Sequence, residues 1–169
     1  MPKRPVIVRP VKQKLVVIAS DAQADTAPSA GAIVRGGTAD LNLAYFGTIP
    51  QRVLDYCGYS GENIAAGGNP IALCEAAVVL TTLVQCREQL KGQKVIWFVD
   101  NSVAVSCFAK GASKEVNVTY MVAAFHMVAL LHDVHVWFEF VKSEDNWADG
   151  VSRKPVSYTH LTLPTILLV

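Results

Sequence analysis

The chain has 169 residues, of which 51% are hydrophobic, and its formal net charge is +1. This length allows one domain with a sizeable core, and this hydrophobicity excludes a largely disordered protein. No run reaches the roughly 18 apolar residues of a membrane-spanning helix, and the basic N-terminus lacks the apolar stretch of a secretory signal. We therefore expect an intracellular protein outside the membrane, in a compartment that the sequence does not specify.

The positive charges are concentrated at the N-terminus. Five of the fifteen Lys and Arg residues lie within residues 1–14, together with three prolines. This segment is typical of an extended basic linker, either a tether to an upstream domain or an arm that contacts phosphates. The body from Leu15 to Pro155 carries ten basic and fourteen acidic residues. Such an acidic balance does not fit a surface that coats nucleic acid, and it suits a metal site better.

The cysteines form no metal-binding pattern. Cys57, Cys74, Cys86 and Cys107 include no CxxC pair and have no His at zinc-finger spacing. Because free cysteines are usually buried, we expect free, mostly buried thiols in a reducing compartment.

The N-terminal part of the body alternates short apolar runs with turns. Leu15 to Ala19 predicts a buried strand that ends at Ser20 and Asp21. Residues 30–35 and 41–49 predict two more strands, and the short connections between all three favour an antiparallel meander. After Pro50 a short helix is expected.

A long helix is expected next, with Pro70 in its first turn and its end near Leu90. Its apolar stripe consists of Ile71, Cys74, Val78, Val79 and Leu83. Glu75 falls on this stripe, where it needs a partner because a buried unpaired charge is expensive. The alternative is a Glu at the edge of the stripe whose carboxylate reaches solvent.

The run from Val95 to Val99 consists of five consecutive apolar residues and stops at Asp100 and Asn101. Such a short run, rich in β-branched and aromatic residues, predicts a strand that is buried on both faces. Asp100 should therefore lie near the carboxyl end of a central strand, where α/β sheets tend to place ligand sites.

Two helices, a strand and a helical turn complete the pattern, over residues 102–110, 115–131, 134–141 and 146–149. His126 and His132 have no ligand spacing to another His, so we interpret both as structural. Three strands followed by a helix, a strand, two helices and a strand indicate an α/β domain. Its mixed sheet should join an antiparallel edge to parallel crossovers.

The tail, residues 156–169, has no periodicity that continues the domain. Its beginning, from Val156 to Leu161, resembles the translation of a transposon-derived sequencing adapter. We interpret the tail as non-native and exclude it from the fold, which leaves residues 15–155 as the single domain. The alternative is a genuine apolar tail.

Four acids lie at predicted strand ends and helix starts: Asp21, Glu75, Asp100 and Asp149. If they meet, four carboxylates cannot crowd together in the ionised state without cations. Mg²⁺ binds carboxylate and phosphate oxygens and completes its shell with water. We therefore interpret the four acids as ligands of metal ions for phosphodiester chemistry. The alternative is that Asp at strand ends only stabilises turns.

Local motifs around three of these acids are more specific. They run from Phe98 to Ala104 around Asp100, from Ala72 to Ala77 around Glu75, and from Asn146 to Arg153 around Asp149. These residues resemble the ribonuclease H-like domains of retroelement reverse transcriptases. Such domains carry a DN-x-x-A strand end, a helix with an ELxA-like sequence and an N-x-A-D-x-x-S-R finish. The resemblance covers about Leu15 to Arg153.

The resemblance implies a ribonuclease H-like fold, with a five-stranded mixed sheet of three antiparallel strands plus parallel crossovers, flanked by helices. It implies endonucleolytic hydrolysis of the RNA strand of RNA/DNA hybrids. Asp21, Glu75, Asp100 and Asp149 would be the catalytic residues and would hold two Mg²⁺ ions, with Mn²⁺ as a substitute. Asn101 is a candidate for positioning the substrate. A reverse transcriptase domain is expected upstream in the same polyprotein.

Two departures from the family pattern matter. Many cellular ribonucleases H place a catalytic His in a longer loop before the last Asp, whereas the loop from Ser143 to Asn146 is short and has no His. No lysine-rich insertion lies between Gly111 and Val116, so the grip on substrate would depend on another domain. Two alternatives stay open. One is a catalytically degenerate domain that binds nucleic acid or acts as a spacer, and the other is a DNA nuclease or resolvase on the same fold.

Overall fold

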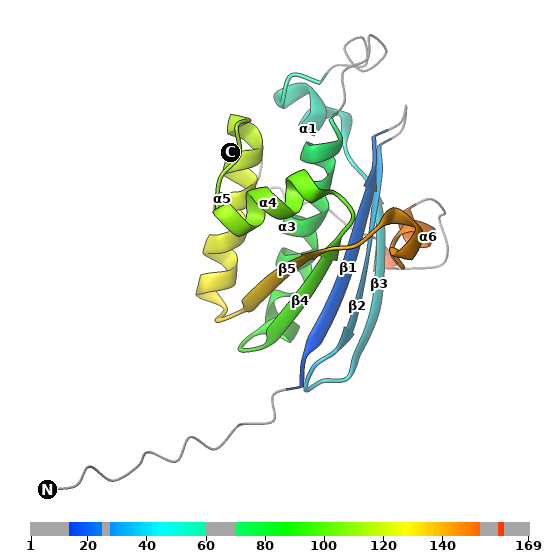
Figure 1. Cartoon of the computed structure of the whole chain (residues 1–169), viewed down its shortest axis with the longest axis vertical. Helices are drawn as coiled ribbons and strands as arrows, with labels where there is room; N and C mark the ends of the chain where they lie inside the picture. The colour runs from blue at the N-terminus through cyan, green and yellow to red at the C-terminus, as the bar shows by residue number, and fades with distance from the viewer. Residues whose placement is uncertain (1–13, 25–27, 60–69, 153–158, 161–169) are drawn as a thin grey trace, which may run out of the picture.

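The computed structural model describes residues 14–24, 28–59, 70–152 and 159–160. Figure 1 shows its helices and strands with the labels used here. The strands are β1 (Val16–Gln23), β2 (Ser29–Gly36), β3 (Leu41–Thr48), β4 (Lys94–Val99), β5 (His135–Phe140) and β6 (Thr159–His160). The helices are α1 (Gln51–Tyr56), α3 (Ile71–Leu90), α4 (Ser102–Lys110), α5 (Val116–Leu131), the 3₁₀ helix η1 (Ser143–Asp145) and α6 (Asp149–Ser152).

The described strands form one sheet with the order β5-β4-β1-β2-β3-β6. β1, β2 and β3 form the predicted antiparallel meander, and β1, β4 and β5 run parallel to one another. β1 extends beyond its predicted end because it pairs with β2 as far as Gln23. Gly36 and Gly37 have φ angles of 88° and 74°, and glycine adopts such angles without strain at the turn between β2 and β3.

Three helices, α3, α4 and α5, lie on one side of the sheet, and α6 lies on the other (Figure 1). The main core is between the sheet and the three helices. Four aromatic rings meet there, with contacting centroids between 4.9 and 5.9 Å apart: Trp97, Phe108, Phe125 and Phe138. This cluster joins α4 and α5 to β4 and β5. It therefore holds the start of α4 in place relative to the end of β4.

β4 departs from the prediction of burial on both faces. Val95, Trp97 and Val99 are buried under the helices, whereas Ile96 and Phe98 on the opposite face are only half-buried. In the described part of the chain, the segment after β5 contacts this opposite face through Trp147, whose ring lies 6.1 Å from that of Phe98. A run of five apolar residues therefore indicates a central strand here, but not the number of layers packed on it.

α3 is buried over most of its circumference, because it packs against β1 and β2 on one side and against α5 on another. Near its end, the Cys86 thiol donates a hydrogen bond to the Tyr45 hydroxyl at 3.1 Å. The four cysteines are free and three are buried, which agrees with the predicted thiols. His126 Nε2 lies 2.9 Å from the Phe108 carbonyl oxygen, as a structural role requires. Among the described helices, none combines the length and apolarity needed to cross a membrane.

Gly31 of β2 allows α6 to lie directly on the sheet. A Cβ atom at this position would come within 2.7 Å of the Ser152 backbone nitrogen and 2.9 Å of the Val151 carbonyl carbon. We expect Gly31→Ala to lower the free energy of unfolding by about 1–3 kcal/mol, because the backbone of α6 must move to accommodate the methyl group.

Gly150→Ala is the matched control for this prediction. Gly150 lies within α6, and a Cβ atom there meets nothing within 4 Å. This substitution should leave stability unchanged or raise it by up to about 1 kcal/mol, since alanine loses less backbone entropy than glycine in a helix. Denaturant unfolding of both variants and the parent measures the difference, and equal losses from the two substitutions would contradict the prediction.

The two ends of the chain fall largely outside the described residues. These ends include residues 1–13 of the predicted linker and most of the predicted non-native tail. Within the tail, Thr159 and His160 form β6, which pairs in parallel with Tyr45 and Phe46 of β3. This pairing was not expected, because the tail was excluded from the fold. The domain boundaries and the non-native origin of the tail stay predictions.

We expect deletion of residues 156–169 to leave the denaturation midpoint unchanged within error. The described contribution of the tail to the sheet is a strand of two residues, which adds few hydrogen bonds to an edge. Urea unfolding of the full chain and of a chain that ends at Pro155 would measure the effect. A loss above about 1 kcal/mol would show that the tail belongs to the native fold.

Candidate metal centre

Two acids meet at the carboxyl ends of the neighbouring parallel strands β1 and β4. Ser20 pairs with Val99, so the next residues, Asp21 and Asp100, follow at the same level of the sheet. Asp21 is 4% exposed and Asp100 is half-buried. The site therefore lies where a parallel crossover was expected to place it.

Glu75 reaches these two acids from α3. Its side chain is only 1% exposed, and its Oε1 accepts a hydrogen bond from the Ala22 backbone nitrogen at 3.1 Å. Its Oε2 is buried and has no hydrogen-bond partner in the described part of the chain. The alternative of a Glu that reaches solvent from the edge of the stripe is wrong, because α3 is enclosed between the sheet and α5.

Asp21, Glu75 and Asp100 form one cluster, hereafter the acidic cluster. Each offers a carboxylate oxygen, and these oxygens all lie within 4.8 Å of one another. Burial raises the pKa of Glu75 well above its ordinary value, and the charges of Asp100 and Asp21 raise it further. Burial also raises the pKa of Asp21 to about 6, although a hydrogen bond from Ser152 opposes the change. The cluster thus concentrates negative charge that a cation would stabilise.

Asp149 lies beside the acidic cluster without joining it. It is the first residue of α6, and its charge raises the pKa of Asp21. The Ser152 hydroxyl contacts both the Asp21 carboxylate and the Asp149 carbonyl oxygen, the latter at 3.0 Å. It is not among the residues whose oxygens lie within 4.8 Å of one another. The structure therefore brings together three of the four predicted acids and places the fourth next to them.

Polar contacts attach the segment around α6 to β1 and β2. The Ser152 hydroxyl donates a hydrogen bond to the Asp21 carboxylate, and the Ser152 carbonyl accepts one from the Ser29 hydroxyl at 2.8 Å. The Asn146 amide nitrogen donates to the Ser20 carbonyl oxygen at 3.1 Å. The sequence motif contains Asn146 and Ser152, but sequence reasoning gave them no role. Both are polar residues at fixed positions in that motif, and this observation could have indicated a structural role for them.

Asn101 caps α4. Its Oδ1 accepts hydrogen bonds from the backbone nitrogens of Val103 and Ala104, both at 3.0 Å. Such a cap satisfies donors that the first turn of a helix leaves unpaired, and here it orients the helix that starts directly beyond Asp100. The predicted contact with substrate would use the amide nitrogen, which the cap does not involve.

The donor set fits a hard divalent cation. Carboxylate oxygens are preferred ligands of Mg²⁺. The buried Oε2 of Glu75 accepts no hydrogen bond from the described residues, and a bound cation would give it a partner. Burial and the neighbouring carboxylates raise the pKa values of Asp21 and Glu75, and a bound cation would offset both effects by stabilising the ionised carboxylates. No described Cys or His belongs to the acidic cluster, so thiolate or imidazole coordination of zinc does not fit it.

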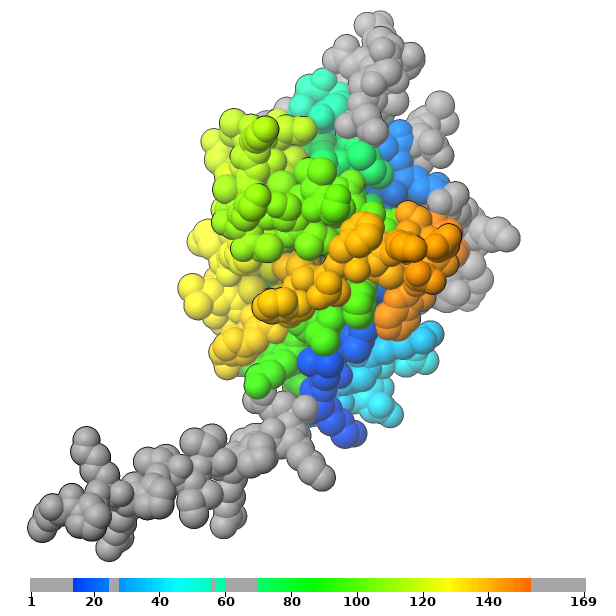
Figure 2. Space-filling model, in the orientation of Figure 1, coloured from blue at the N-terminus to red at the C-terminus, as the bar shows by residue number. Residues whose placement is uncertain are grey.

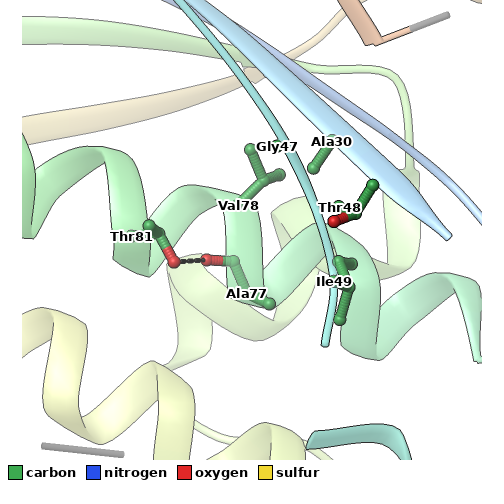
Figure 3. A pocket seen from close by; sticks show the side chains of 7 residues that line it. All are labelled: Ala30, Gly47, Thr48, Ile49, Ala77, Val78 and Thr81. Carbon is green, nitrogen blue, oxygen red and sulfur yellow. Dashed lines mark hydrogen bonds between the residues drawn. The ribbon is translucent and has the colours of Figure 1, made fainter. Parts of the chain in front are cut away.

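Two hollows of different size lie on α3 and α4. The first is a cavity between β2, β3 and α3. The residues that line it are Ala30, Gly47, Thr48, Ile49, Ala77, Val78 and Thr81 (Figure 3). Its volume is about 20 Å³, enough for one water molecule. The Thr81 hydroxyl donates its hydrogen bond to the Ala77 carbonyl oxygen within α3 (Figure 3). The second hollow is a groove of about 580 Å³ beside α4, lined by Lys110, Lys114 and Glu115 among others.

The strand order and the arrangement of helices on the two sides of the sheet define a ribonuclease H-like fold, as the sequence predicted. Solved structures with this fold include RNase H1 from the halophilic archaeon Halobacterium salinarum. It matches with a TM-score of 0.61 and 9% identity, over 82% of this chain and 94% of that chain.

Two further structures are similar. LC11-RNase H1 in complex with RNA/DNA hybrid gives a TM-score of 0.59 at 13% identity, over 80% of this chain and 91% of that chain. The N-terminal RNase H domain of rv2228c from Mycobacterium tuberculosis gives 0.54 at 15% identity, over 82% and 90%. No family model matches the sequence, and no curated protein matches it. At these identities the structural similarity establishes the fold alone.

Proposed function

We propose that this chain is a metal-dependent nuclease that hydrolyses the RNA strand of RNA/DNA hybrids, as the ribonuclease H module of a retroelement polyprotein. The observation that carries the proposal is the acidic cluster, whose oxygens lie within 4.8 Å of one another. Burial and mutual repulsion both destabilise ionised carboxylates, so such a cluster lowers the stability of a fold unless it binds cations. The motifs around Asp100 and Asp149 support the retroelement assignment.

Asp21, Glu75, Asp100 and Asp149 would hold two Mg²⁺ ions, or Mn²⁺ in their place. Ions bound at such a site supply an activated water and stabilise the charge on the leaving oxygen. The chain itself positions the ligands. Ser152 engages Asp21 Oδ2 and the Ala22 backbone nitrogen engages Glu75 Oε1, which leaves the second oxygen of each carboxylate for metal. Asp100 is more exposed than these two and would face the substrate.

The groove beside α4 would bind the nucleic acid backbone. Besides Lys110 and Lys114, it is lined by the hydroxyl groups of Ser102, Ser106 and Ser113. Because α4 begins two residues after Asp100, the groove starts next to the acidic cluster. Lysine and hydroxyl groups are common partners of phosphate oxygens. Selection of RNA would come from contacts with 2′-hydroxyl groups, with the amide nitrogen of Asn101 helping to position the strand.

The groove carries little positive charge for a nucleic acid duplex, because Glu115 lines it together with the two lysines. We therefore propose that a reverse transcriptase domain upstream in the same polyprotein provides further contacts that bind the duplex. One similar protein, LC11-RNase H1, was solved in complex with RNA/DNA hybrid, which supports the choice of substrate.

A cleavage assay with three end-labelled substrates tests the proposal: an RNA/DNA hybrid, duplex DNA and single-stranded RNA. We expect the chain to cut only the RNA strand of the hybrid, in Mg²⁺ at low salt, and EDTA to stop it. Low salt matters because affinity that rests on phosphate contacts falls steeply with ionic strength. Cutting of duplex DNA would indicate a DNA nuclease instead. Retention of the hybrid without cleavage would indicate a degenerate binding domain, and either result would reject the proposal.

A further inference from the structure

The outer face of α5 is apolar and exposed. Six apolar residues share this face and are open to solvent: Val116, Tyr120, Ala123, Met127, Leu130 and Leu131. His126 lies at the edge of the face, with its Nε2 at 2.9 Å from the Phe108 carbonyl oxygen. The exposed fractions of Leu130 and Leu131 are 83% and 77%. α5 contains no Asp, Glu, Lys or Arg, although a helix with one solvated face normally carries charge there. Figure 2 shows the yellow and yellow-green part of the chain, which includes α5, at one flank of the molecule.

We propose that this face binds the same face of a second copy of the chain, with the two α5 helices antiparallel. Val116, Tyr120, Ala123, Met127 and Leu130 follow one another at intervals of four, three, four and three residues. This spacing is that of a seam between two packed helices. A symmetric dimer uses one self-complementary surface on both chains, which is what a single apolar stripe offers.

The stripe is close to symmetric about Ala123, because Val116 and Leu130 lie seven residues before and after it, whereas Tyr120 lies three residues before and Met127 four after. A two-fold axis at this residue places Tyr120 against the partner's Met127, and Val116 against the partner's Leu130. Ala123 itself, the smallest residue of the stripe, lies at the crossing point and allows the two backbones to approach closely. A thioether beside an aromatic ring is a favourable contact, so the Tyr–Met pairing adds to the apolar burial.

The charges that flank α5 favour the same orientation. Lys114 and Glu115 precede the helix, and His132 and Asp133 follow it. Antiparallel pairing brings Lys114 towards the partner's Asp133 and Glu115 towards the partner's His132. Parallel pairing would place Lys114, Glu115 and Asp133 each against the identical residue of the partner, and like charges repel. Within the chain, Asp133 lies 3.1 Å from His135 and His132 lies 3.8 Å from Glu88. Asp133, His135 and Glu88 are exposed, so these contacts compete only weakly.

The exposed area is sufficient for a stable contact. The large apolar side chains of the stripe are 62–83% exposed. Their combined exposed area is on the order of 600 Å², close to the ~800 Å² that each partner contributes to an interface of standard size. None of these residues belongs to the acidic cluster, so the inference does not depend on the proposed nuclease activity.

Sedimentation equilibrium of the full chain across the micromolar range tests the association. We expect a dimer at the upper end of that range. Met127→Glu should raise the dissociation constant at least about tenfold, because a charge would be placed in an apolar contact. Val103→Glu is the matched control, since Val103 is a 58% exposed apolar residue of α4 outside the stripe. A chain that stays monomeric, or equal weakening by both substitutions, would overturn the proposal and leave the face to a different partner.

Disulfide trapping tests the orientation independently of that comparison. In the antiparallel dimer the two copies of residue 123 meet at the axis, whereas the two copies of residue 116 lie about 20 Å apart. Oxidation with copper phenanthroline should therefore cross-link the Ala123→Cys chain and not the Val116→Cys chain. The unmodified chain serves as the reference for the native cysteines, three of which are buried. Cross-linking at 116, or none at 123 in a chain with unchanged circular dichroism, would overturn the antiparallel dimer.

Discussion

Replacement of Asp100 by Asn should reduce hybrid cleavage by orders of magnitude and leave the fold at least as stable as before. The two side chains are nearly the same size and Asp100 is half-buried, so packing should survive. Without metal, the substitution removes one charge from the acidic cluster, where Asp100 raises the pKa of both Glu75 and Asp21. The apo variant should therefore melt at the same temperature as the parent or higher. With metal, a ligand is lost and the two-ion site cannot assemble.

Thermal melts with and without Mg²⁺, beside the cleavage assay, would measure these effects. Mg²⁺ should raise the melting temperature of the variant less than that of the parent, because stabilisation follows binding to the native state. Asp145→Asn removes an exposed acid from η1 and serves as the control that should change neither property. A purely structural Asp100 predicts the reverse pattern, with modest destabilisation and an unchanged response to Mg²⁺. Unchanged cleavage would remove Asp100 from the mechanism and the ribonuclease proposal with it.

Without metal, the protein should be more stable at pH 5 than at pH 8. The pKa of Asp21 is raised from 3.8 to about 6 in the folded state. The folded chain therefore binds this proton more tightly than the unfolded chain, and stability falls as the pH rises through this window. Between pH 5 and 8, Asp21 alone should account for about 1–1.5 kcal/mol. Glu75, whose pKa is also raised, should extend the loss to higher pH.

Mg²⁺ should reduce this pH dependence, because a metal ion binds the ionised carboxylates that high pH favours. Urea unfolding at a series of pH values, once in EDTA and once in excess Mg²⁺, would show both effects. Asp21→Asn should flatten the profile in EDTA, and Asp145→Asn should not. A free energy of unfolding that rises from pH 5 to pH 8 in EDTA would contradict the electrostatic description of the acidic cluster.

The fold could be predicted because local signals in this chain agree with one another. The apolar run before Asp100 locates a central strand, the closely spaced runs up to residue 49 indicate a meander, and Pro70 marks the start of the long helix. The burial of the two faces of β4 could not be predicted in the same way. Five consecutive apolar residues do not reveal that the face with Ile96 and Phe98 is only half-buried in the described structure, where Trp147 packs near Phe98.

The acidic cluster was partly predictable for a similar reason. Asp21 and Asp100 end two apolar runs, and adjacent parallel strands bring such ends together. The depth of Glu75 was ambiguous, because helical periodicity gives the direction of a side chain and not the number of layers around its helix. The anchoring of Asp21 by Ser152 depends on how α6 packs on Gly31, a contact between residues far apart in the sequence. No local pattern records a contact of that kind.

The attachment of α6 to β1 also bears on when the site forms during synthesis. The hydrogen bond from Ser152 to Asp21 joins residues 131 positions apart, and that from Asn146 to Ser20 joins residues 126 apart. Contacts with such separation form late, because the entropy of closing a long loop must be overcome first. On the ribosome β1 emerges early, but Asp21 acquires its anchor only after almost the whole domain has been made. In a nascent chain the acidic cluster should therefore lack this anchor until the last helical turn has emerged.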